Sequence, residues 1–378
     1  MKRMSDQNSQ SRPPDAVKLC GFRALGAVLL LCVGLVMIVL LAGREADARV
    51  RGKCRDCHSM HAKDATPGMT NGSCLDCHGR NPAGEENIIT VGKMRIPQVI
   101  HRKADGDLAA GNFAYVADMF SPNYSSGHNI AGLTHAEFPP MDMPPGFEGN
   151  VIMPNGFGPM VWPQQQQVNC AGTWGCHGDR TVEDPYKAMS GAHHEDDRVI
   201  DGSTVGKSFR FLLGVKGVEH KDWEYLATVD DHNGYKGDMT HNERDTISYL
   251  CGQCHSKFHP NPYQGGAREV GTAYYTPWTR HPADISFSAM HTAYAGSEYQ
   301  NFVKYSLEVP VGFHEPTGKE DTVNINSVVI CQSCHRSHAS PYPDALRWDY
   351  DRMLSRSGAA GTGCLTCHTR KGNMGLLQ

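Results

Sequence analysis

Six short cysteine–histidine motifs constrain this chain more than any other feature of its sequence. Five are CxxCH runs, and the sixth, CAGTWGCH, has a wider cysteine spacing. The motif residues are, in order, Cys54, Cys57 and His58; Cys74, Cys77 and His78; Cys170, Cys176 and His177; Cys251, Cys254 and His255; Cys331, Cys334 and His335; Cys364, Cys367 and His368. Two thiols at the CxxCH spacing bond the vinyl groups of one porphyrin while the histidine ligates its iron, so the motifs predict covalently attached haem c.

Disulfides and zinc are the other common uses of paired cysteines. Of the 14 cysteines, only Cys20 and Cys32 stand outside the motifs, and both lie in the N-terminal apolar region, so no thiol remains for disulfides. A zinc ribbon would not need a histidine after every pair. We therefore predict six haems. For the wide motif, attachment through Cys176 alone and the absence of haem are the alternatives.

The number of histidines predicts the second axial ligand of each iron. Six of the 20 histidines belong to motifs, and the other fourteen exceed the six distal ligands that six haems require. This surplus favours bis-histidine irons, which carry electrons and bind substrate poorly. Methionine ligation is the alternative. His61 follows His58 by three residues, too short a loop for both to bind one iron, so His61 either has no special role or ligates a different haem.

The N-terminal region predicts export. Residues 24–43 form an uncharged apolar run that follows several basic residues and precedes Ala46-Asp47-Ala48, an A-x-A cleavage site. We expect 1–48 to be a signal peptide, with a retained membrane anchor as the alternative, and 49–378 to be a single hexahaem domain outside the cytoplasm. The formal net charge of −4, without a basic stripe, indicates no nucleic-acid partner.

The composition predicts a fold without an ordinary layered core. With 40 glycines and 22 prolines the chain has few long periodic segments. We expect a multihaem cytochrome c fold, mostly irregular with short α-helices and few short strands, wrapped around a chain of six closely packed haems. Short helices are expected at 242–250 and 343–355, and short strands at 302–310 and 322–330. The proline-rich and glycine-rich stretch 138–163 is expected to cover haem faces.

The order of the motifs also resembles a known family. The runs CRDCHSMH, SGHNIAG, CGQCHSKFH, TRHPADI and CQSCHRSHAS occur in this order between residues 54 and 340. Together they resemble the hexahaem outer-surface c-type cytochromes of metal-reducing bacteria, the OmcS type, which polymerise into haem-threaded filaments. The chain departs from that pattern at its third motif, which lacks a second histidine nearby.

The resemblance implies particular distal ligands. His128, His259, His281 and His338 match the family pattern, and one further ligand would come from His101, His193 or His194. His61 would cross to a neighbouring copy and ligate the haem held by Cys331, Cys334 and His335, so that copies join head-to-tail. The rival is ligation by His61 within its own chain.

These features predict an electron carrier rather than an enzyme. The expected function is extracellular electron transfer by a filament subunit at the cell surface, with other redox cytochromes and acceptors such as metal oxides as partners. One alternative is a discrete periplasmic or membrane-anchored carrier. The second alternative is a multihaem reductase with one open iron.

Overall fold

The structure is a computed structural model of the 378-residue chain. It describes residues 50, 52–61, 67–79, 86–102, 106–117, 122–133, 143–147, 162–163, 166–195, 198–238, 243–258, 281, 283–287, 304–357 and 361–372. The chain divides into the units 1–47 and 48–378, and every described residue belongs to the second unit.

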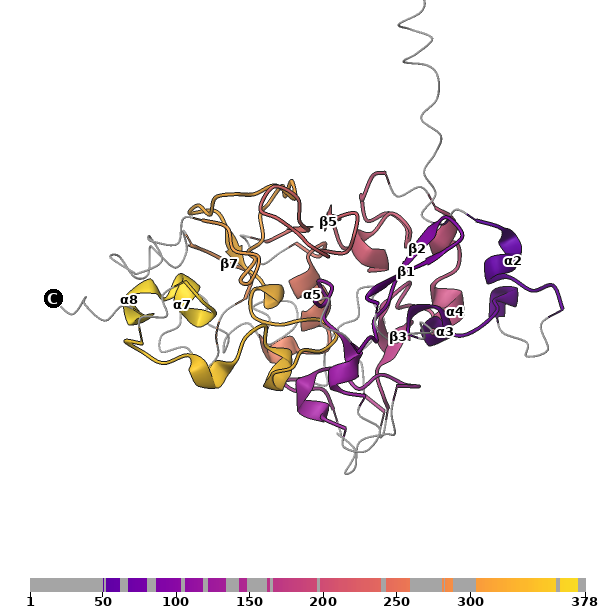
Figure 1. The fold of residues 1–378 in the computed structure, drawn as a ribbon, viewed down its shortest axis with the longest axis horizontal. Helices are drawn as coiled ribbons and strands as arrows, with labels where there is room; N and C mark the ends of the chain where they lie inside the picture. The colour runs from indigo at the N-terminus through magenta and orange to yellow at the C-terminus, as the bar shows by residue number, and fades with distance from the viewer. Residues whose placement is uncertain are drawn as a thin grey trace, which may run out of the picture. The chain divides into compact units, whose positions relative to one another are not determined.

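Short elements separated by loops make up the described chain (Figure 1). The helices are α2 (Cys54–Cys57), α3 (Cys74–His78), α4 (Pro185–Ala188), α5 (Ile247–Gly252), α7 (Cys364–Cys367) and α8 (Thr369–Gly372). The strands are β1 (Ile88–Val91), β2 (Met94–Pro97), β3 (Asn169–Ala171), β4 (Gly175–His177), β5 (Gly217–Val218), β6 (Gly234–Tyr235), β7 (Ile285–Ser286) and β8 (Val328–Val329). The 3₁₀ turns are η1 (Pro67–Met69), η2 (Phe113–Tyr115), η3 (Tyr124–Ser126), η4 (Ala192–His194), η5 (Phe209–Phe211), η6 (Ser256–Phe258), η9 (Cys331–Ser333), η10 (Pro343–Ala345) and η11 (Tyr350–Arg352). The predicted fold class, mostly irregular with short helices and few short strands, is confirmed.

The described strands form two-stranded ladders only. β1 and β2 make an antiparallel hairpin with Ile89 opposite Ile96, and β5–β6 and β7–β8 are also antiparallel. β3 and β4 pair in parallel, with Ala171 opposite His177. Ladders this small bury little apolar surface by themselves, so other contacts must hold the chain together.

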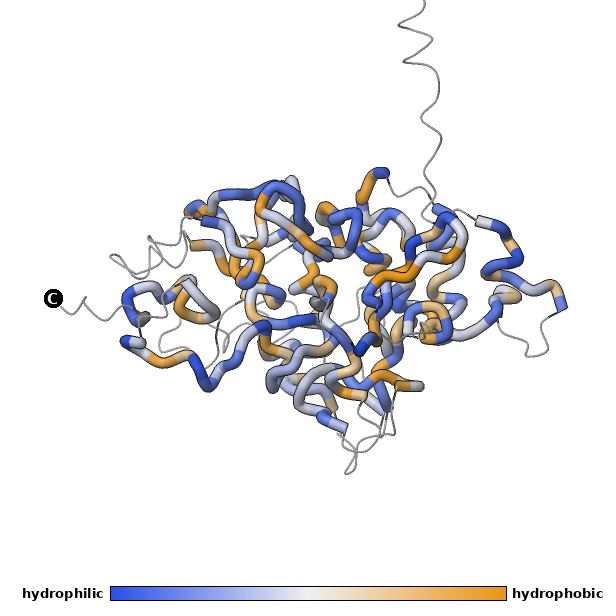
Figure 2. The backbone as a smooth tube through the Cα atoms, viewed as in Figure 1, coloured by the Kyte–Doolittle hydropathy of each residue, from blue (hydrophilic) through white to orange (hydrophobic). Residues whose placement is uncertain are grey.

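The apolar residues gather in several small clusters rather than one large core. One cluster contains Ile285, Phe287, Tyr305 and Val311, and another contains Phe209, Tyr235, Ile247 and Ile330. Figure 2 shows hydrophobic and hydrophilic stretches alternating over short distances along the described backbone. This pattern agrees with an interior to which protein side chains contribute only part of the apolar surface.

Several predicted elements differ from the observed ones. The helix expected at 343–355 is wrong: two 3₁₀ turns, η10 and η11, replace it, because Asp344 and Ala345 have positive φ angles that an α-helix does not allow. The helix expected at 242–250 begins later, at Ile247, where the Thr246 side chain accepts the Tyr249 amide, and it ends at Gly252.

The two predicted strands also differ from the observed ones. The strand expected at 302–310 is wrong over its described part, residues 304–310, where only Lys304 forms a bridge, with Thr322. Of the strand expected at 322–330, the structure retains β8. The hairpin β1–β2 is an additional element that the sequence analysis did not predict.

Within the described residues no helix has the length and apolar character needed to cross a membrane. The predicted leader, 1–48 with its apolar run 24–43, lies outside the described residues, so its cleavage and the division at residue 48 stay predictions.

Candidate haem sites

In each CxxCH run, a short helical segment starts at the first cysteine or includes it. α2, α3 and α7 start at the first cysteine of their motifs, α5 contains Cys251, and η9 starts at Cys331. In α3 the Ser73 hydroxyl accepts the Asp76 amide while the Asp76 carboxylate accepts the Ser73 amide, a capping box that fixes where the turn begins. Such a turn places both cysteines on one side of the chain.

The wide motif uses a different local structure. Cys170 lies in β3 and Cys176 lies in β4, and the parallel pairing of these strands brings the two ends of the motif together. Gly172, between them, has a φ of 85° and its position has no room for a Cβ, which would lie 2.8 Å from the Glu183 carbonyl oxygen. A strand–turn–strand unit therefore replaces the helical turn where the cysteine spacing is longer.

Backbone carbonyls orient the motif histidines. The Nδ1 atoms of His58, His78, His177, His255 and His335 lie 2.7–3.0 Å from the carbonyl oxygens of Gly68, Pro97, Arg210, Pro145 and Asp344. A carbonyl oxygen only accepts hydrogen bonds, so Nδ1 carries the proton and the lone pair of the ring is on Nε2. This is the tautomer that a metal-binding histidine needs.

Five motif histidines face a second histidine ring. The ring centres are 6.0 Å apart for His58 and His194, 6.3 Å for His78 and His193, 6.3 Å for His177 and His338, 6.1 Å for His255 and His128, and 6.3 Å for His368 and His281. Metal–imidazole bonds are about 2 Å long, so two imidazoles on opposite sides of one metal ion have ring centres about 6 Å apart. These five pairs therefore fit six-coordinate haem iron.

Burial keeps several of these imidazoles neutral. Desolvation lowers the pKa of His78, His128 and His177. The same effect, with the charge of a neighbouring histidine, lowers the pKa of His255 to about 4 and that of His338 to about 3. Only a neutral imidazole ligates iron, so the surroundings favour the ligand form at neutral pH.

Interactions between cysteine thiols of different motifs show which motifs lie near one another. The charge of Cys57 raises the pKa of Cys77, and that of Cys254 raises the pKa of Cys176. Hydrogen bonds join Cys74 to Cys170 and Cys251 to Cys331, and Cys364 raises the pKa of Cys334. Each of these interactions joins cysteines of consecutive motifs, so motifs that follow one another in the sequence also lie near one another in space.

His335 is the exception among the motif histidines. It is exposed, its Nδ1 donates to the Asp344 carbonyl at 2.7 Å, and no ring of a described histidine faces its other nitrogen. His61, likewise exposed, has no facing ring among the described residues. The fifth site therefore lacks a second histidine from the part of this chain that the structure describes.

The other described histidines have different partners. His101 lies 3.6 Å from the Asp107 carboxylate, and His232 donates from Nδ1 to the Asn233 carbonyl at 2.9 Å. His220 accepts backbone amides through Nδ1, and His314 pairs with Glu243 at 3.3 Å. The structure therefore does not bring His101 to a motif histidine. His259 lies outside the described residues, as do His135, His241 and His291.

The adjacent histidines of η4 lie opposite the histidines of two different motifs. His194 faces His58 and His193 faces His78. The sequence alone proposes His193 and His194 as alternatives for one remaining ligand position, whereas in the structure each lies opposite a different motif histidine. The run His193-His194 was the available signal, because adjacent residues in a 3₁₀ turn point in different directions and can reach two neighbouring sites.

Only part of the stretch 138–163, which was expected to cover haem faces, lies within the described residues. Residues 143–147 lie against the fourth motif, where the Pro145 carbonyl accepts the His255 ring and the Gly146 carbonyl accepts the Ser256 hydroxyl at 3.2 Å. Phe147 packs edge-on to Trp162. The remaining residues of that stretch, apart from Trp162 and Pro163, lie outside the described residues.

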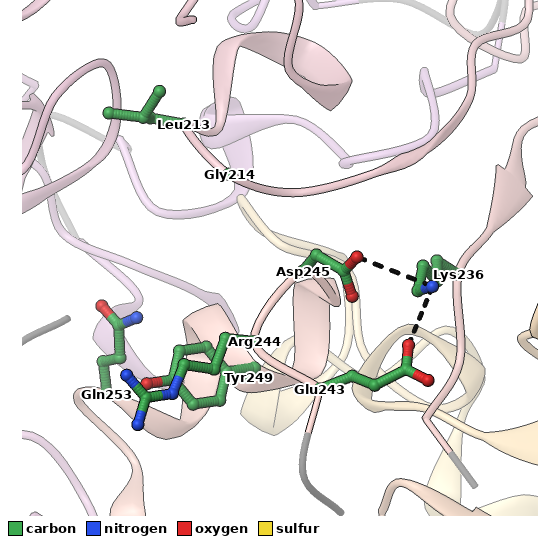
Figure 3. Close-up of a pocket in the computed structure, with 8 residues that line it drawn as sticks. All are labelled: Leu213, Gly214, Lys236, Glu243, Arg244, Asp245, Tyr249 and Gln253. Carbon is green, nitrogen blue, oxygen red and sulfur yellow. Dashed lines mark ion pairs between the residues drawn. The ribbon is translucent and has the colours of Figure 1, made fainter. Parts of the chain in front are cut away.

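A polar pocket beside α5 is not one of these sites. It is lined by Leu213, Gly214, Lys236, Glu243, Arg244, Asp245, Tyr249 and Gln253 (Figure 3). The Lys236 ammonium lies 2.8 Å from Glu243 and 3.6 Å from Asp245, as the dashed lines show. None of these lining residues is a histidine or a cysteine.

Comparison with known proteins agrees with this arrangement of motifs. Residues 326–373 match the family model described as the Doubled CXXCH motif. No curated protein matches the chain. Two solved structures are similar: the Outer Membrane Cytochrome S filament from Geobacter sulfurreducens, with a TM-score of 0.36, and the OmcS nanowires from Geobacter sulfurreducens, with a TM-score of 0.41. In each case the identity is 16%, over 80% of this chain and 85% of the other.

The motifs, the doubled CXXCH segment and the irregular chain of short elements define a multihaem c-type cytochrome, a class of electron-transfer protein.

Proposed function

We propose that this protein is a hexahaem electron carrier whose irons are closed by two histidines each. The five facing ring pairs carry this proposal, because each joins one motif histidine to one distant histidine at 6.0–6.3 Å. The proposed ligand pairs are His58 with His194, His78 with His193, His177 with His338, His255 with His128 and His368 with His281. His101 is not a ligand in this proposal.

When bound, haem would supply one-electron chemistry at iron, cycling between the ferric and ferrous states. The residues of this chain attach, orient and enclose it. The paired cysteines would form the thioethers, backbone carbonyls hold the rings of five motif histidines at Nδ1, and the facing histidines would supply a second imidazole ligand. Two histidines leave no position for a substrate, which favours electron transfer over catalysis.

The proposed count of six includes the wide motif. Support comes from the pairing of β3 with β4, which brings Cys170 and Cys176 near His177, and from the ring of His338 opposite. The intact mass of the purified protein tests the count. A mass that corresponds to five haems, together with a free Cys170 and Cys176, would contradict it.

We propose further that copies join head-to-tail, with His61 of one copy facing His335 of the next. In this proposal the sixth ligand of site five is a histidine from outside the chain. His61 and His335 are both exposed and neither faces a ring among the described residues. Within the second unit, α2 lies at one end and α7 with α8 at the other (Figure 1). Such a head-to-tail contact between different surfaces generates an open filament when the rotation between copies does not close a ring.

Electron microscopy of protein sheared from cells tests the filament proposal. We expect filaments from the parent protein and from His314→Ala, which removes an exposed histidine that pairs with Glu243. We expect discrete particles from His61→Ala. Filaments of unchanged length in His61→Ala would refute the proposed contact between His61 and His335.

A second candidate function follows from His335. In a discrete copy, the described residues would give an iron at site five one histidine ligand, and an open position there would suit a reductase. Visible spectroscopy of parent particles separates the two functions. A high-spin ferric haem that binds carbon monoxide after reduction would favour the reductase. Loss of the high-spin signal when discrete copies assemble into filaments would favour the filament.

We propose export to the cell surface, with other redox cytochromes and acceptors such as metal oxides as partners. The apolar run at 24–43 and the A-x-A site before residue 49 support export. N-terminal sequencing of surface-released protein would give residue 49 first if the leader is cleaved. A start within the leader would favour the membrane-anchored carrier.

A further inference from the structure

Two adjacent residues of η5, Arg210 and Phe211, have left-handed backbone conformations, with φ angles of 51° and 61°. A residue with a Cβ is strained in this region, so the conformation persists only where surrounding contacts hold it. The turn lies against the third motif. The Arg210 carbonyl accepts the His177 Nδ1 proton at 2.9 Å, and the Phe211 carbonyl accepts the Gly178 amide at 2.8 Å. The strained backbone therefore makes the contact that orients a candidate ligand.

The side chain of Arg210 holds this backbone in place. Its Nη2 donates to the His220 carbonyl at 2.8 Å and to Oδ1 of Asn233 at 2.6 Å. Its Nη1 lies 3.5 Å from the Glu219 carboxylate, which also accepts the Arg210 backbone amide at 2.5 Å. Asn233 is itself fixed, because it is buried and its Oδ1 also accepts the His220 amide at 2.9 Å. The backbone amide and the guanidinium of Arg210 are therefore both anchored.

The other carbonyls that accept a motif histidine belong to residues that suit their backbone conformation. Gly68 and Asp344 are also left-handed, with φ angles of 72° and 58°, but glycine has no Cβ and aspartate is enriched in this region. Pro97 and Pro145 have a φ angle fixed by the pyrrolidine ring. Among these described acceptors, only Arg210 combines a left-handed backbone with a long side chain, so its conformation depends on tertiary contacts.

We propose that Arg210 is the positioning residue of the third site, because its side-chain contacts hold the carbonyl that accepts the His177 Nδ1 proton. This inference rests on the proposed ligation of haem iron by His177. A hydrogen bond from Nδ1 makes Nε2 a stronger electron donor, so the Arg210 carbonyl strengthens the bond between His177 and iron. Arg210 is not itself a ligand, since it acts through the orientation and basicity of the His177 ring.

Resonance Raman spectroscopy of the haem-loaded protein tests the proposal in a His338→Ala background. That substitution leaves site three with His177 as its ligand, and a five-coordinate ferrous haem gives an iron–histidine stretching band whose frequency rises with the strength of the Nδ1 hydrogen bond. Six-coordinate haems give no such band, so the difference from the parent spectrum isolates site three. The intact mass first establishes that all haems are attached. A fully loaded His338→Ala protein without the band would overturn the proposed pair of His177 with His338, and this inference with it.

Three substitutions in this background distinguish positioning from a merely stabilising role. Arg210→Gly permits the left-handed backbone but removes the guanidinium contacts, and Asn233→Ala removes one acceptor without altering η5. Arg356→Gly is the matched control, because Arg356 is also left-handed, with a φ of 63°, but exposed. We expect the band to shift to lower frequency in Arg210→Gly, to shift less in Asn233→Ala and to stay in place in Arg356→Gly. A band that is unmoved in Arg210→Gly, even with a lowered unfolding temperature, would overturn the proposal, and if Arg210→Gly does not fold, Asn233→Ala decides in the same way.

Discussion

The backbone amide of His128 donates a hydrogen bond of 2.9 Å to the carbonyl of His338. The ring of His128 faces His255 of the fourth motif, and the ring of His338 faces His177 of the third. One contact between two distant segments therefore positions the candidate ligands of two neighbouring sites. Disturbing this crossing should affect both sites together.

Gly127→Ala tests the crossing of these segments. An added Cβ would lie 2.3 Å from the His338 carbonyl oxygen and 2.4 Å from the Ala339 Cβ, so the segments must move apart. We expect a loss of about 1–3 kcal/mol of stability, as for other overpacked sites, and high-spin ferric haem at two sites. Thermal unfolding and visible spectra measure these effects. Gly52→Ala, where the Cβ would meet only the flexible Met94 side chain at 3.1 Å, should resemble the parent.

His338→Ala should open a single iron. Its ring stands opposite His177, so its removal leaves site three with one histidine. We expect carbon monoxide to bind one additional haem per chain after reduction. His314→Ala is the control, because His314 pairs with Glu243 and faces no motif histidine. An unchanged carbon monoxide stoichiometry in His338→Ala would contradict the proposed ligand pair.

The ring planes of the facing histidines differ in their relative orientation along the series. They meet at 20° for His58 and His194 but at 88° for His281 and His368. Parallel imidazoles donate π-electrons to one iron d orbital and split the d levels, whereas perpendicular imidazoles leave them nearly degenerate. We expect the oxidised protein to give both a rhombic low-spin electron paramagnetic resonance signal and one with a large maximal g value.

Single substitutions assign these signals. His281→Ala should remove the signal with the large maximal g value, and His194→Ala should weaken the rhombic signal. A spectrum with one kind of low-spin signal, unaffected in shape by His281→Ala, would show that the ring planes are alike in the loaded protein.

Lys236 should make stability fall at alkaline pH. Burial lowers its pKa, but the hydrogen bond with Glu243 and the charge of Asp245 outweigh burial, so the net shift raises the pKa above the ordinary 10.5. A raised folded-state pKa stabilises the protein below about pH 10 and loses that contribution as the pH rises through the folded value. Unfolding midpoints between pH 8 and 12 should fall more steeply for the parent than for Lys236→Met. Lys221→Met, at a side chain 74% exposed, should follow the parent.

The structure differed from the sequence-based prediction where distant segments decide the outcome. Residues 343–355 have a helical composition, yet the chain folds into two 3₁₀ turns that link His335 to Leu346 and Arg347 to Cys334. Tertiary hydrogen bonds outweigh the small helix propensity of a short segment. His101, one of the predicted candidate ligands, lies 3.6 Å from the Asp107 carboxylate, a contact that its sequence neighbourhood does not indicate.

The sequence by itself determined the class of protein and the motif half of each candidate site. Two cysteines and a histidine within eight residues or fewer are a local pattern, and local patterns need no knowledge of the fold. Only the tertiary structure decided which second histidine stands opposite five of the motif histidines, for example His193 opposite His78 and His128 opposite His255. These rings meet across long stretches of chain, and their meeting depends on backbone crossings such as that of His128 with His338, which no local pattern encodes.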